Sequence, residues 1–479
     1  MHRQAKPVRL FLLLPWVLCT LAARSPGQPA STSSAPELLN TIEALVATLS
    51  AGEPQRWEQF ARERFAPEAL SRRTPEQRRQ LLARLHEDFG TMRLTGIRPQ
   101  DDPWAADVEV RSSAGTIAGT LHVELEPAPP HRIRQFGISV DQGGDGRPKT
   151  SLPPPPDLRG AKDPQRLSSL LDPYLEKLAA DDTLSGVVLV AHAGKPLFER
   201  AYGLADRERK APNTTDTRFN VGSIGKQFTR VAIGQLLAAG KLALDDPLAR
   251  HLPGYPNHDA ARKITIRQLL EHRAGVVDIF DVIHAGDPPP RSNHEWFLRV
   301  APLPLQFPPG TQKRYCNGCY VVLGEVVAAL SGTTYEDYLA SHVFAPAGMS
   351  AAFLAGSDPE ERKARGYTRT PAGLEVASLG PGGRGCGAGG VFATGRDLLA
   401  YDNALREYRL LDRERTAWML DGADSTGSRA GGASTVAGGA PGVNAVLASE
   451  GEWTVIVLTN HDPRAGEDLG IALARAILR

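Results

Sequence analysis

Hydrophobic and polar positions follow two different periods in the first third of the chain. Between residues 36 and 89 apolar side chains recur every three or four positions, as at Leu38, Ile42 and Leu45, which predicts amphipathic helices. From residue 91 to 140 apolar and polar residues alternate in stretches such as ADVEVRSS, GTIAGTLHVELE and RIRQFGISV, and this period of two predicts strands. Helices followed by an antiparallel sheet are typical of a small α+β domain, which we place at residues 36–140.

A second domain follows a segment rich in glycine and proline. Residues 141–160, DQGGDGRPKTSLPPPPDLRG, have the composition of a linker that is stiff where the prolines adjoin. Residues 161–479 begin with a helical pattern and a hairpin pattern, SGVVLVAHAG and KPLFERAYGLAD. They end with another hairpin, NAVLASEGEWTVIVLTN, and a last helix. Strands at both ends with helices between them predict one antiparallel sheet assembled from distant segments.

The first residues have a third pattern. Basic MHRQAKPVR is followed by apolar LFLLLPWVLCTLAA and then by small residues, which predicts an export signal peptide over residues 1–23, cleaved after Ala22 or Ala23. The apolar run is too short to stay as a membrane span, although a retained N-terminal anchor is the alternative. We therefore expect an exported protein, periplasmic or secreted, with no integral membrane segment after cleavage.

Composition narrows the function further. The chain has 479 residues, 41% hydrophobic and 23% charged, as expected for a soluble globular protein of two or three domains. The formal net charge of +1 gives no basic surface, which argues against a nucleic-acid partner. Oligomeric state is left open by the sequence.

The stretch RFNVGSIGKQFTRVAIGQLL, residues 218–237, carries candidate chemistry. Ser223 falls where an apolar helix begins, and free backbone N–H groups at such an end favour developing negative charge. Lys226 is three residues on, so it shares a face with Ser223. A serine nucleophile needs a base, and a lysine in a cleft wall can be one because burial penalises the ammonium form. The alternative is a serine helix cap with a solvated lysine.

A tyrosine and an asparagine two residues apart usually complete such a serine–lysine site. The chain contains three such pairs: Tyr255–Asn257, Tyr315–Asn317 and Tyr401–Asn403. Tyr401–Asn403 lies in a predicted helix, where the two side chains point to different sides, surface and core respectively. Tyr255 lies in a proline-bounded turn and is expected to pack as a lid. Tyr315 and Asn317 lie at a strand-to-loop-to-helix transition and are chosen for the site.

Four segments, NVGSIGKQFTRVAIGQLLAAGKLALDDPL, TIRQLLEHRAGV, PPGTQKRYCNGCYVVLGEVV and GAGGVFATGRDLLAY, appear in the order typical of class C β-lactamase-like serine hydrolases. That family includes β-lactamases, penicillin-binding D-alanyl carboxypeptidases, D-aminopeptidases and esterases, and the resemblance covers about residues 165–479. It implies an α/β (α+β) fold, with an antiparallel sheet flanked by helices plus a helical lobe and the site between. The α+β domain before it faintly resembles the cone-shaped nuclear-transport-factor-like domains and is expected to be an accessory module.

The same resemblance implies a role for each candidate. Ser223 is implied as the nucleophile and Lys226 as its base. Tyr315 is implied as the proton shuttle to the leaving group, and Asn317 as a hydrogen-bond partner of the substrate and the lysine. No metal or organic cofactor is required, and the expected partner is a small-molecule or peptide-like substrate.

The family's third motif, a Lys or His followed by any residue and Gly, is altered here. The matching triplet is Val436-Ala437-Gly438, so the cation is missing, while Gly439 can still offer a second oxyanion N–H. This favours an ester or amide substrate without a carboxylate to anchor. A β-lactamase, D-alanyl-D-alanine carboxypeptidase or D-aminopeptidase is the enzyme alternative, and a non-catalytic binding or regulatory protein of the same fold is another.

Three cysteines remain beyond the signal segment, and thiols of exported proteins tend to pair. We hypothesise a Cys316–Cys386 disulfide that holds the Tyr315 loop and leaves Cys319 free. A Cys316–Cys319 disulfide and three free thiols are the rivals, and Cys316-x-x-Cys319 is only half of a zinc site. His272, in LLEHRAGV, is expected to pack and cap a helix end and not to act as a general base.

Overall fold

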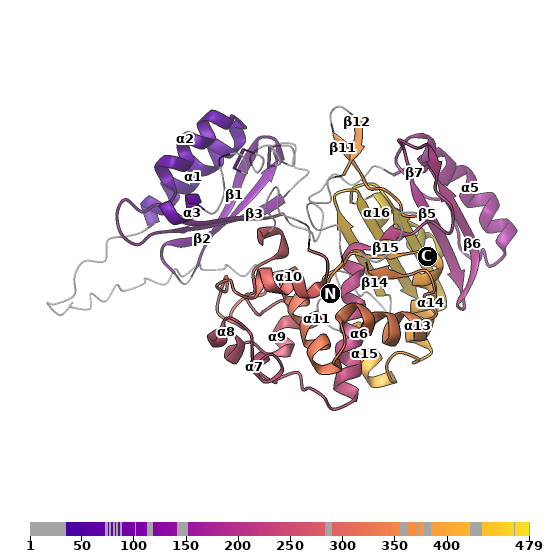
Figure 1. The fold of residues 1–479 in the computed structure, drawn as a ribbon. Coiled ribbons are helices and arrows are strands. Elements are labelled where there is room, and N and C mark those ends of the chain that lie inside the picture. The colour runs from indigo at the N-terminus through magenta and orange to yellow at the C-terminus, as the bar shows by residue number, and fades with distance from the viewer. Residues whose placement is uncertain are drawn as a thin grey trace, which may run out of the picture. The chain divides into compact units, whose positions relative to one another are not determined.

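The computed structural model describes most of the chain in two compact units, residues 1–147 and 148–479 (Figure 1). The described residues are 35–71, 75, 78–79, 82, 85–86, 89–100, 102–112, 118–140, 152–282, 290–354, 362–370, 373–377, 385–421, 434–463 and 465–478. The predicted signal peptide and residues 141–151 of the predicted linker lie outside them. Among these described ranges no helix is long and apolar enough to cross a membrane.

Helices precede an antiparallel sheet in the first unit, where the period of the sequence changes. Its elements are α1 (Ala35–Ala51), α2 (Pro54–Arg64), α3 (Pro67–Ser71), β1 (Met92–Pro99), β2 (Ala105–Ser112), β3 (Ala118–Leu125) and β4 (Ile133–Val140). The strands pair in the order β1-β2-β3-β4, each antiparallel to the next. Alternate residues of β2 and β3, including Val108 and Leu121, face a core that contains the fully buried Trp57. The likeness to a nuclear-transport-factor-like cone stays a prediction.

A five-stranded antiparallel sheet lies at the centre of the second unit. Its strands, in spatial order, are β14 (Ser434–Ala440), β15 (Val443–Glu450), β16 (Trp453–Thr459), β5 (Gly186–His192) and β6 (Lys195–Tyr202). The last strand of the chain therefore pairs with the first strand of this unit, as the two terminal hairpin patterns predicted.

Both faces of this sheet are covered, which explains why β5 reads as a continuous apolar run. Helices α5 (Pro164–Ala180) and α16 (Ala465–Leu478) pack on the face that carries Val188 and Val190. The opposite face, which carries Val187 and Leu189, contributes to a larger core shared with the helical lobe. Successive side chains of β5 thus point to opposite faces of the sheet and join two separate hydrophobic cores.

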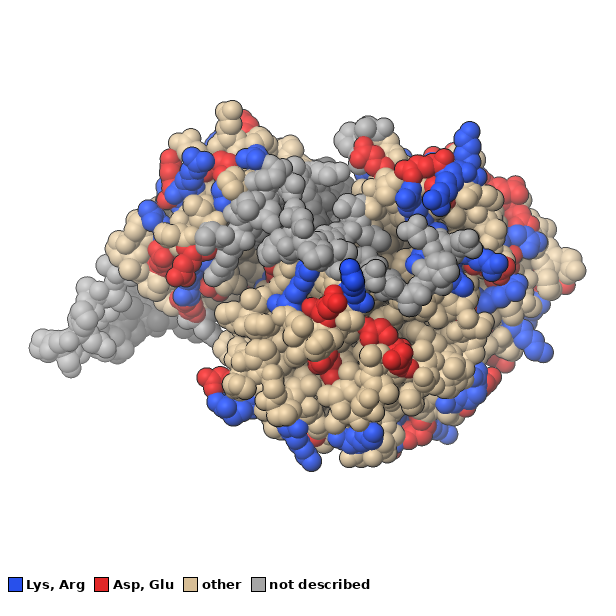
Figure 2. Space-filling view, viewed as in Figure 1, with Lys and Arg blue, Asp and Glu red and all other residues tan. Residues whose placement is uncertain are grey.

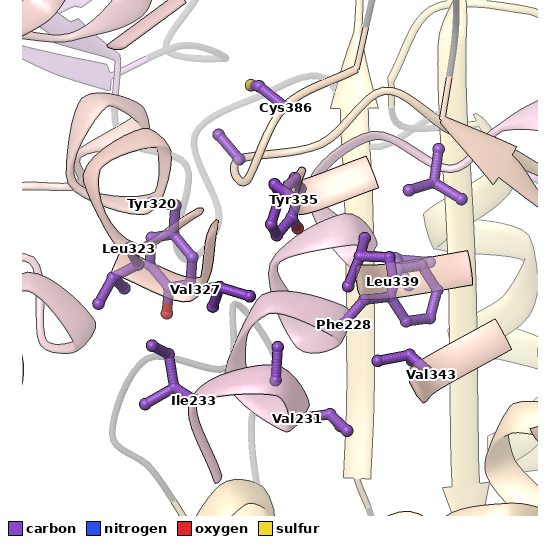
Figure 3. Close-up of a cluster of buried hydrophobic side chains, with 14 of the residues drawn as sticks. Phe228, Val231, Ile233, Tyr320, Leu323, Val327, Tyr335, Leu339, Val343 and Cys386 are labelled. Atoms are coloured by element: carbon purple, nitrogen blue, oxygen red, sulfur yellow. The ribbon is translucent and has the colours of Figure 1, made fainter. Parts of the chain in front are cut away.

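The helical lobe is built around two helices that are buried on nearly all sides. Its helices are α6 (Gly225–Ala238), α7 (Leu248–His251), α8 (His258–Lys263), α9 (Ile266–Leu270), α10 (Asn293–Val300), α11 (Asn317–Ser331), α12 (Tyr335–Leu339), α13 (Ala345–Ala347), α14 (Gly395–Arg406) and α15 (Arg413–Asp421), with short turns η1 (Gly222–Ile224), η2 (Ile279–Val282) and η3 (Ala340–Phe344). Most positions of α6 and of α11 are buried, and Figure 3 shows Phe228 and Val231 of α6 in one cluster with Tyr320 and Leu323 of α11.

Short strands form small sheets of their own in the second unit. They are β7 (Leu204–Asp206) with β8 (Ala211–Pro212), β11 (Tyr367–Thr370) with β12 (Gly373–Val376), and β9 (Phe219–Asn220), β10 (Phe353–Leu354) and β13 (Val391–Ala393) in the order β10-β13-β9. Because β13 pairs with β9, the glycine-rich loop before β13 lies against the turn that carries Ser223.

In Figure 2 basic and acidic side chains of the described residues are interspersed over the visible face.

The two unused Tyr-x-Asn pairs correct our expectations. Tyr401 is 1% exposed and packs against Phe228, whereas Asn403 is half-buried and donates its side-chain amide to a backbone carbonyl at the β5–β6 turn. The surface and core assignments were therefore reversed, because α14 presents Tyr401 to the large core. Tyr255 is also in that core, against Phe297, and is not a lid.

Candidate active site

Ser223 occupies the single turn η1 that leads directly into α6. Gly222 precedes it with φ 53°, a left-handed conformation that favours glycine, and its N–H donates to Asn220 Oδ1 at 2.9 Å. A Cβ on Gly225 would lie 2.7 Å from the Cα of Gly389, so the glycine-rich loop and this turn touch backbone to backbone. The sequence around Ser223 therefore folds into a turn with space for close neighbours on both sides.

Lys226 lies one turn further on and is nearly enclosed, with 5% of its surface exposed. Its Nζ lies 2.7 Å from Asn317 Oδ1, 2.8 Å from the carbonyl oxygen of Ala388 and 3.2 Å from Ser223 Oγ. An amide oxygen and a carbonyl oxygen only accept hydrogen bonds. These two acceptors therefore hold the Lys226 amine in place beside the Ser223 hydroxyl.

Tyr315 also contacts Ser223. Its hydroxyl donates to Ser223 Oγ at 2.8 Å, and its side chain is 42% exposed. The Nζ of Lys226 lies 4.7 Å from the centre of the Tyr315 ring, a distance at which a cation is attracted to an aromatic face. The structure thus brings Ser223, Lys226, Tyr315 and Asn317 into one connected cluster.

Asp278 belongs to this cluster and was missed by the sequence analysis. Its carboxylate accepts the backbone N–H of Asn317 at 2.9 Å and the side-chain Nδ2 of Asn317 at 3.0 and 3.2 Å. Asp278 lies three residues beyond Gly275, a turn glycine with φ 76°. The signal was an acidic residue just past the segment LLEHRAGV, which attracted notice only for its histidine.

His272 packs beneath Tyr315. The two ring centres are 4.7 Å apart, and His272 Nδ1 accepts the backbone N–H of Cys316 at 3.0 Å. Burial, together with the charge of Lys226, lowers the pKa of His272 to about 3, so the imidazole is neutral at ordinary pH. This arrangement agrees with the packing role expected for His272.

Strand β14 lies against the turn that carries Ser223. A Cβ on Gly438 would lie 2.7 Å from the backbone nitrogen of Ser223, and a Cβ on Gly222 would lie 2.8 Å from the backbone nitrogen of Gly439. Val436, where a cation was expected from the family pattern, is an apolar side chain that is 6% exposed and pairs across the sheet with Leu447. The wall next to Ser223 therefore offers backbone groups and no charge from position 436.

The cysteine hypothesis is wrong. Cys316 and Cys319 form a disulfide, and Cys386 is free and buried. Cys316 caps α11 and Cys319 lies in its first turn, where residues three apart share a face. Burial raises the pKa of the Cys386 thiol to about 11. Among the described residues, no group of three or more His, Cys, Asp or Glu side chains could hold a metal ion.

Comparisons with known proteins identify the family of this chain. The Beta-lactamase family model matches residues 171–478. A protein of Bacillus subtilis, provisionally named as penicillin-binding protein PbpX, is 28% identical over 72% of this chain and 86% of its own length. Esterase EstB of Burkholderia gladioli is 32% identical over 41% of this chain and 54% of its length, and a D-aminopeptidase of Brucella anthropi is 32% identical over 35% and 32%.

Solved structures give the same result. The penicillin binding protein from Bacillus halodurans superposes with a TM-score of 0.55 at 27% identity, over 63% of this chain and 99% of that one. D-amino acid amidase from Ochrobactrum anthropi shares the fold with a TM-score of 0.55 at 24% identity, over 64% of this chain and 98% of that one. The chain therefore belongs to the Beta-lactamase family, whose fold it shares with penicillin-binding proteins, D-aminopeptidases and esterases.

Proposed function

We propose that this protein is an exported serine hydrolase that works through an acyl-enzyme at Ser223, on an ester or amide that carries no carboxylate beside the reacting carbonyl. The observation that carries the proposal is the convergence of two polar groups on one hydroxyl. Lys226 Nζ lies 3.2 Å and Tyr315 OH 2.8 Å from Ser223 Oγ. Such distances meet the requirement that a nucleophile and its base lie within hydrogen-bond reach.

Acylation follows from these contacts. Ser223 Oγ attacks the substrate carbonyl while its proton passes to Lys226, whose N–H bonds are held by Asn317 Oδ1 and Ala388 O. The backbone N–H groups of Ser223 and Gly439 stabilise the oxyanion, and one such donor contributes about 100- to 1,000-fold to kcat. Tyr315 then protonates the leaving group.

Deacylation reuses the same groups. Water attacks the acyl carbonyl and gives its proton to the Tyr315 oxygen, which lost a proton to the leaving group. Ser223 then recovers its proton from Lys226 as the acyl bond breaks. Tyr315 is 42% exposed, and the proposal has both the leaving group and the water pass on its side.

The substrate class rests on position 436. Positive charge beside the tyrosine would hold a substrate carboxylate and polarise the hydroxyl, and Val436 supplies neither. An ester or a neutral amide has no carboxylate for such a charge to hold, so its binding does not depend on a cation at position 436. Relatives of this chain are named as an esterase and as a D-aminopeptidase, one name for each of the two proposed substrate classes, ester and amide.

A β-lactamase or D-alanyl peptidase is the second candidate, favoured by the extent of the match to the Bacillus subtilis relative, 86% of whose length is covered. A binding protein that has lost turnover is the third. The α+β unit that precedes the hydrolase unit is proposed as an accessory module in all three cases.

One labelling experiment separates these candidates. The purified protein is exposed to a fluorescent penicillin and to a fluorophosphonate probe, with Ser223→Ala as the control. Labelling of Ser223 by the fluorophosphonate alone supports the ester or amide hydrolase. Labelling by both supports the second candidate, and labelling by neither refutes the hydrolase proposal.

Export is tested separately. The proposal rests on the basic, apolar and small-residue pattern of residues 1–23. N-terminal sequencing of the protein recovered from its native host is expected to begin at Ala23 or Arg24. A mature chain that still begins at Met1 would refute the cleaved signal.

A further inference from the structure

We infer that Asp278 is a positioning residue of the proposed acyl-transfer site, which holds the Asn317 amide in the one orientation that supports Lys226. The inference rests on the proposed function and extends it to a residue that touches neither the nucleophile nor the base. Its carboxylate accepts two N–H groups of Asn317, one from the backbone at 2.9 Å and one from the side chain at 3.0 Å.

The orientation of the Asn317 amide decides what Lys226 meets. The amide has a donating end, Nδ2, and an accepting end, Oδ1. Asp278 only accepts, so Nδ2 turns toward it and Oδ1 turns toward Lys226 Nζ, 2.7 Å away. A rotated amide would set an oxygen against the carboxylate and an NH₂ group against the amine. Both hydrogen bonds would be lost together, so the carboxylate excludes the rotated form.

This orientation also fixes the direction of Lys226. Two of the three contacts of its Nζ are to groups that only accept, Asn317 Oδ1 and Ala388 O, and the third is Ser223 Oγ. When the Asn317 oxygen turns away, the amine loses one acceptor and is free to rotate away from Ser223. A misplacement of about 1 Å in such a site costs on the order of 100-fold in rate.

Asp278 is itself held rigidly. The N–H of Phe280 donates to Asp278 Oδ1 at 3.1 Å, which closes a local turn. On the other side, a Cβ on Gly318 would lie 2.0 Å from the carbonyl oxygen of Val277, so this segment rests directly on the first turn of α11. The carboxylate therefore has a fixed position from which to orient the amide.

A purely structural role for Asp278 is the competing explanation. An acidic side chain beside the N-terminus of α11 stabilises the helix whatever Asn317 does. That role predicts that replacing Asp278 lowers stability and activity equally, with or without the Asn317 amide. The positioning role predicts that the effect on the reaction requires the amide.

The test measures the second-order rate constant for labelling of Ser223 by a fluorophosphonate. Asp278→Asn keeps the size of the side chain but lets it both donate and accept, so the Asn317 amide is no longer oriented. We expect labelling to slow by about 10- to 100-fold. Asp281→Asn is the matched control, because Asp281 lies in the same turn and accepts from Gln306 Nε2; its labelling rate is expected to stay within about twofold of wild type.

The decisive comparison is made in Asn317→Ala. There the amide is absent, and adding Asp278→Asn is expected to slow labelling no further, which is the non-additivity of residues that act through one another. An undiminished loss in that background, or a wild-type rate for Asp278→Asn, overturns the inference. Asp278→Ala serves in its place if Asp278→Asn does not fold by circular dichroism. A wild-type protein that is not labelled at all refutes the proposed function instead.

Discussion

Adding a single methyl group at Gly438 is expected to separate two parts of the site. Ideal geometry places a Cβ at this position 2.0 Å from the carbonyl oxygen of Val221 and 2.7 Å from the backbone nitrogen of Ser223. Carbon and carbonyl oxygen normally approach to about 3.3 Å. Both neighbours are backbone atoms and no side chain can rotate away, so strand β14 must move from the Ser223 turn by on the order of 1 Å.

The displacement has two measurable costs. Overpacking of this kind destabilises a core by about 1–3 kcal/mol, and each kcal/mol lowers the Tm of a domain of this size by about 1–2 °C. The N–H of Gly439 moves with the strand, away from the oxyanion position proposed beside the N–H of Ser223. Loss of one oxyanion donor lowers kcat by about 100- to 1,000-fold, equivalent to about 3–4 kcal/mol of barrier.

The assay compares Gly438→Ala with a matched overpacking control. Gly234→Ala adds the same methyl group on α6, where its nearest neighbours are the flexible Leu411 Cδ2 and Cδ1 at 2.9 and 3.1 Å. Both variants are followed by thermal unfolding and by hydrolysis of a p-nitrophenyl ester. Gly234→Ala is expected to change Tm by a few degrees at most and to keep kcat. A folded Gly438→Ala with wild-type kcat would refute the reasoning that β14 supplies an oxyanion donor.

Three further predictions concern other parts of the second unit. Tyr315→Phe is expected to slow hydrolysis of an alkyl ester by at least about tenfold more than that of a p-nitrophenyl ester of the same acid, because only the alkoxide must be protonated as it leaves; equal losses would contradict the proton-shuttle role. Burial lowers the pKa of His461 to about 4, below the 6.5 of an exposed histidine. The unfolded chain therefore binds the extra proton first, so this residue's contribution is intact above pH 6.5 and is lost as the pH falls toward 4, by up to about 1.4 kcal/mol per pH unit. His461→Gln is expected to reduce the slope of the unfolding free energy against pH between pH 6 and 4.5 by that amount. An unchanged slope would contradict the lowered pKa of His461. Replacing both Cys316 and Cys319 by serine is expected to lower the unfolding free energy by about 2 kcal/mol for so short a loop, and alkylation of the unfolded, unreduced wild type is expected to label Cys386 and neither of the other two.

Residues close in sequence were the ones that sequence analysis found. Ser223 and Lys226 are one helical turn apart, so their contact follows from helix geometry alone. Tyr315 and Asn317 were chosen from three pairs because they lie where a loop enters a helix, and the structure brings Tyr315 to Ser223 and Asn317 to Lys226. In each case a local rule was sufficient.

Contacts made by tertiary approach were not predictable in this way. The third partner of Lys226 is the backbone carbonyl of Ala388. Every residue type has this group, so the sequence does not indicate which carbonyl takes part. Asp278 meets Asn317 only because a turn from another part of the lobe lies on α11. Likewise the face of α14 that carries Tyr401 was misassigned, because helix periodicity does not say which side meets the core.

The disulfide was misassigned for a different reason. Cys316 and Cys386 were paired because both were expected near the same cleft, and their shared neighbourhood outweighed the short spacing of Cys316 and Cys319. At the start of a helix, residues three apart already lie close enough to bond. Local geometry was the stronger indication.

The pairing of β5 with β16 has a consequence for biosynthesis. β5 spans Gly186–His192, whereas its neighbour β16, Trp453–Thr459, is translated only after the whole helical lobe. Throughout translation of the intervening residues, β5 lacks its β16 neighbour and one edge of the central sheet is open. Chains that terminate before β14 therefore carry Ser223 and Lys226 without the strand that lies against the Ser223 turn, and the proposed site can form only after β14, β15 and β16 have been made.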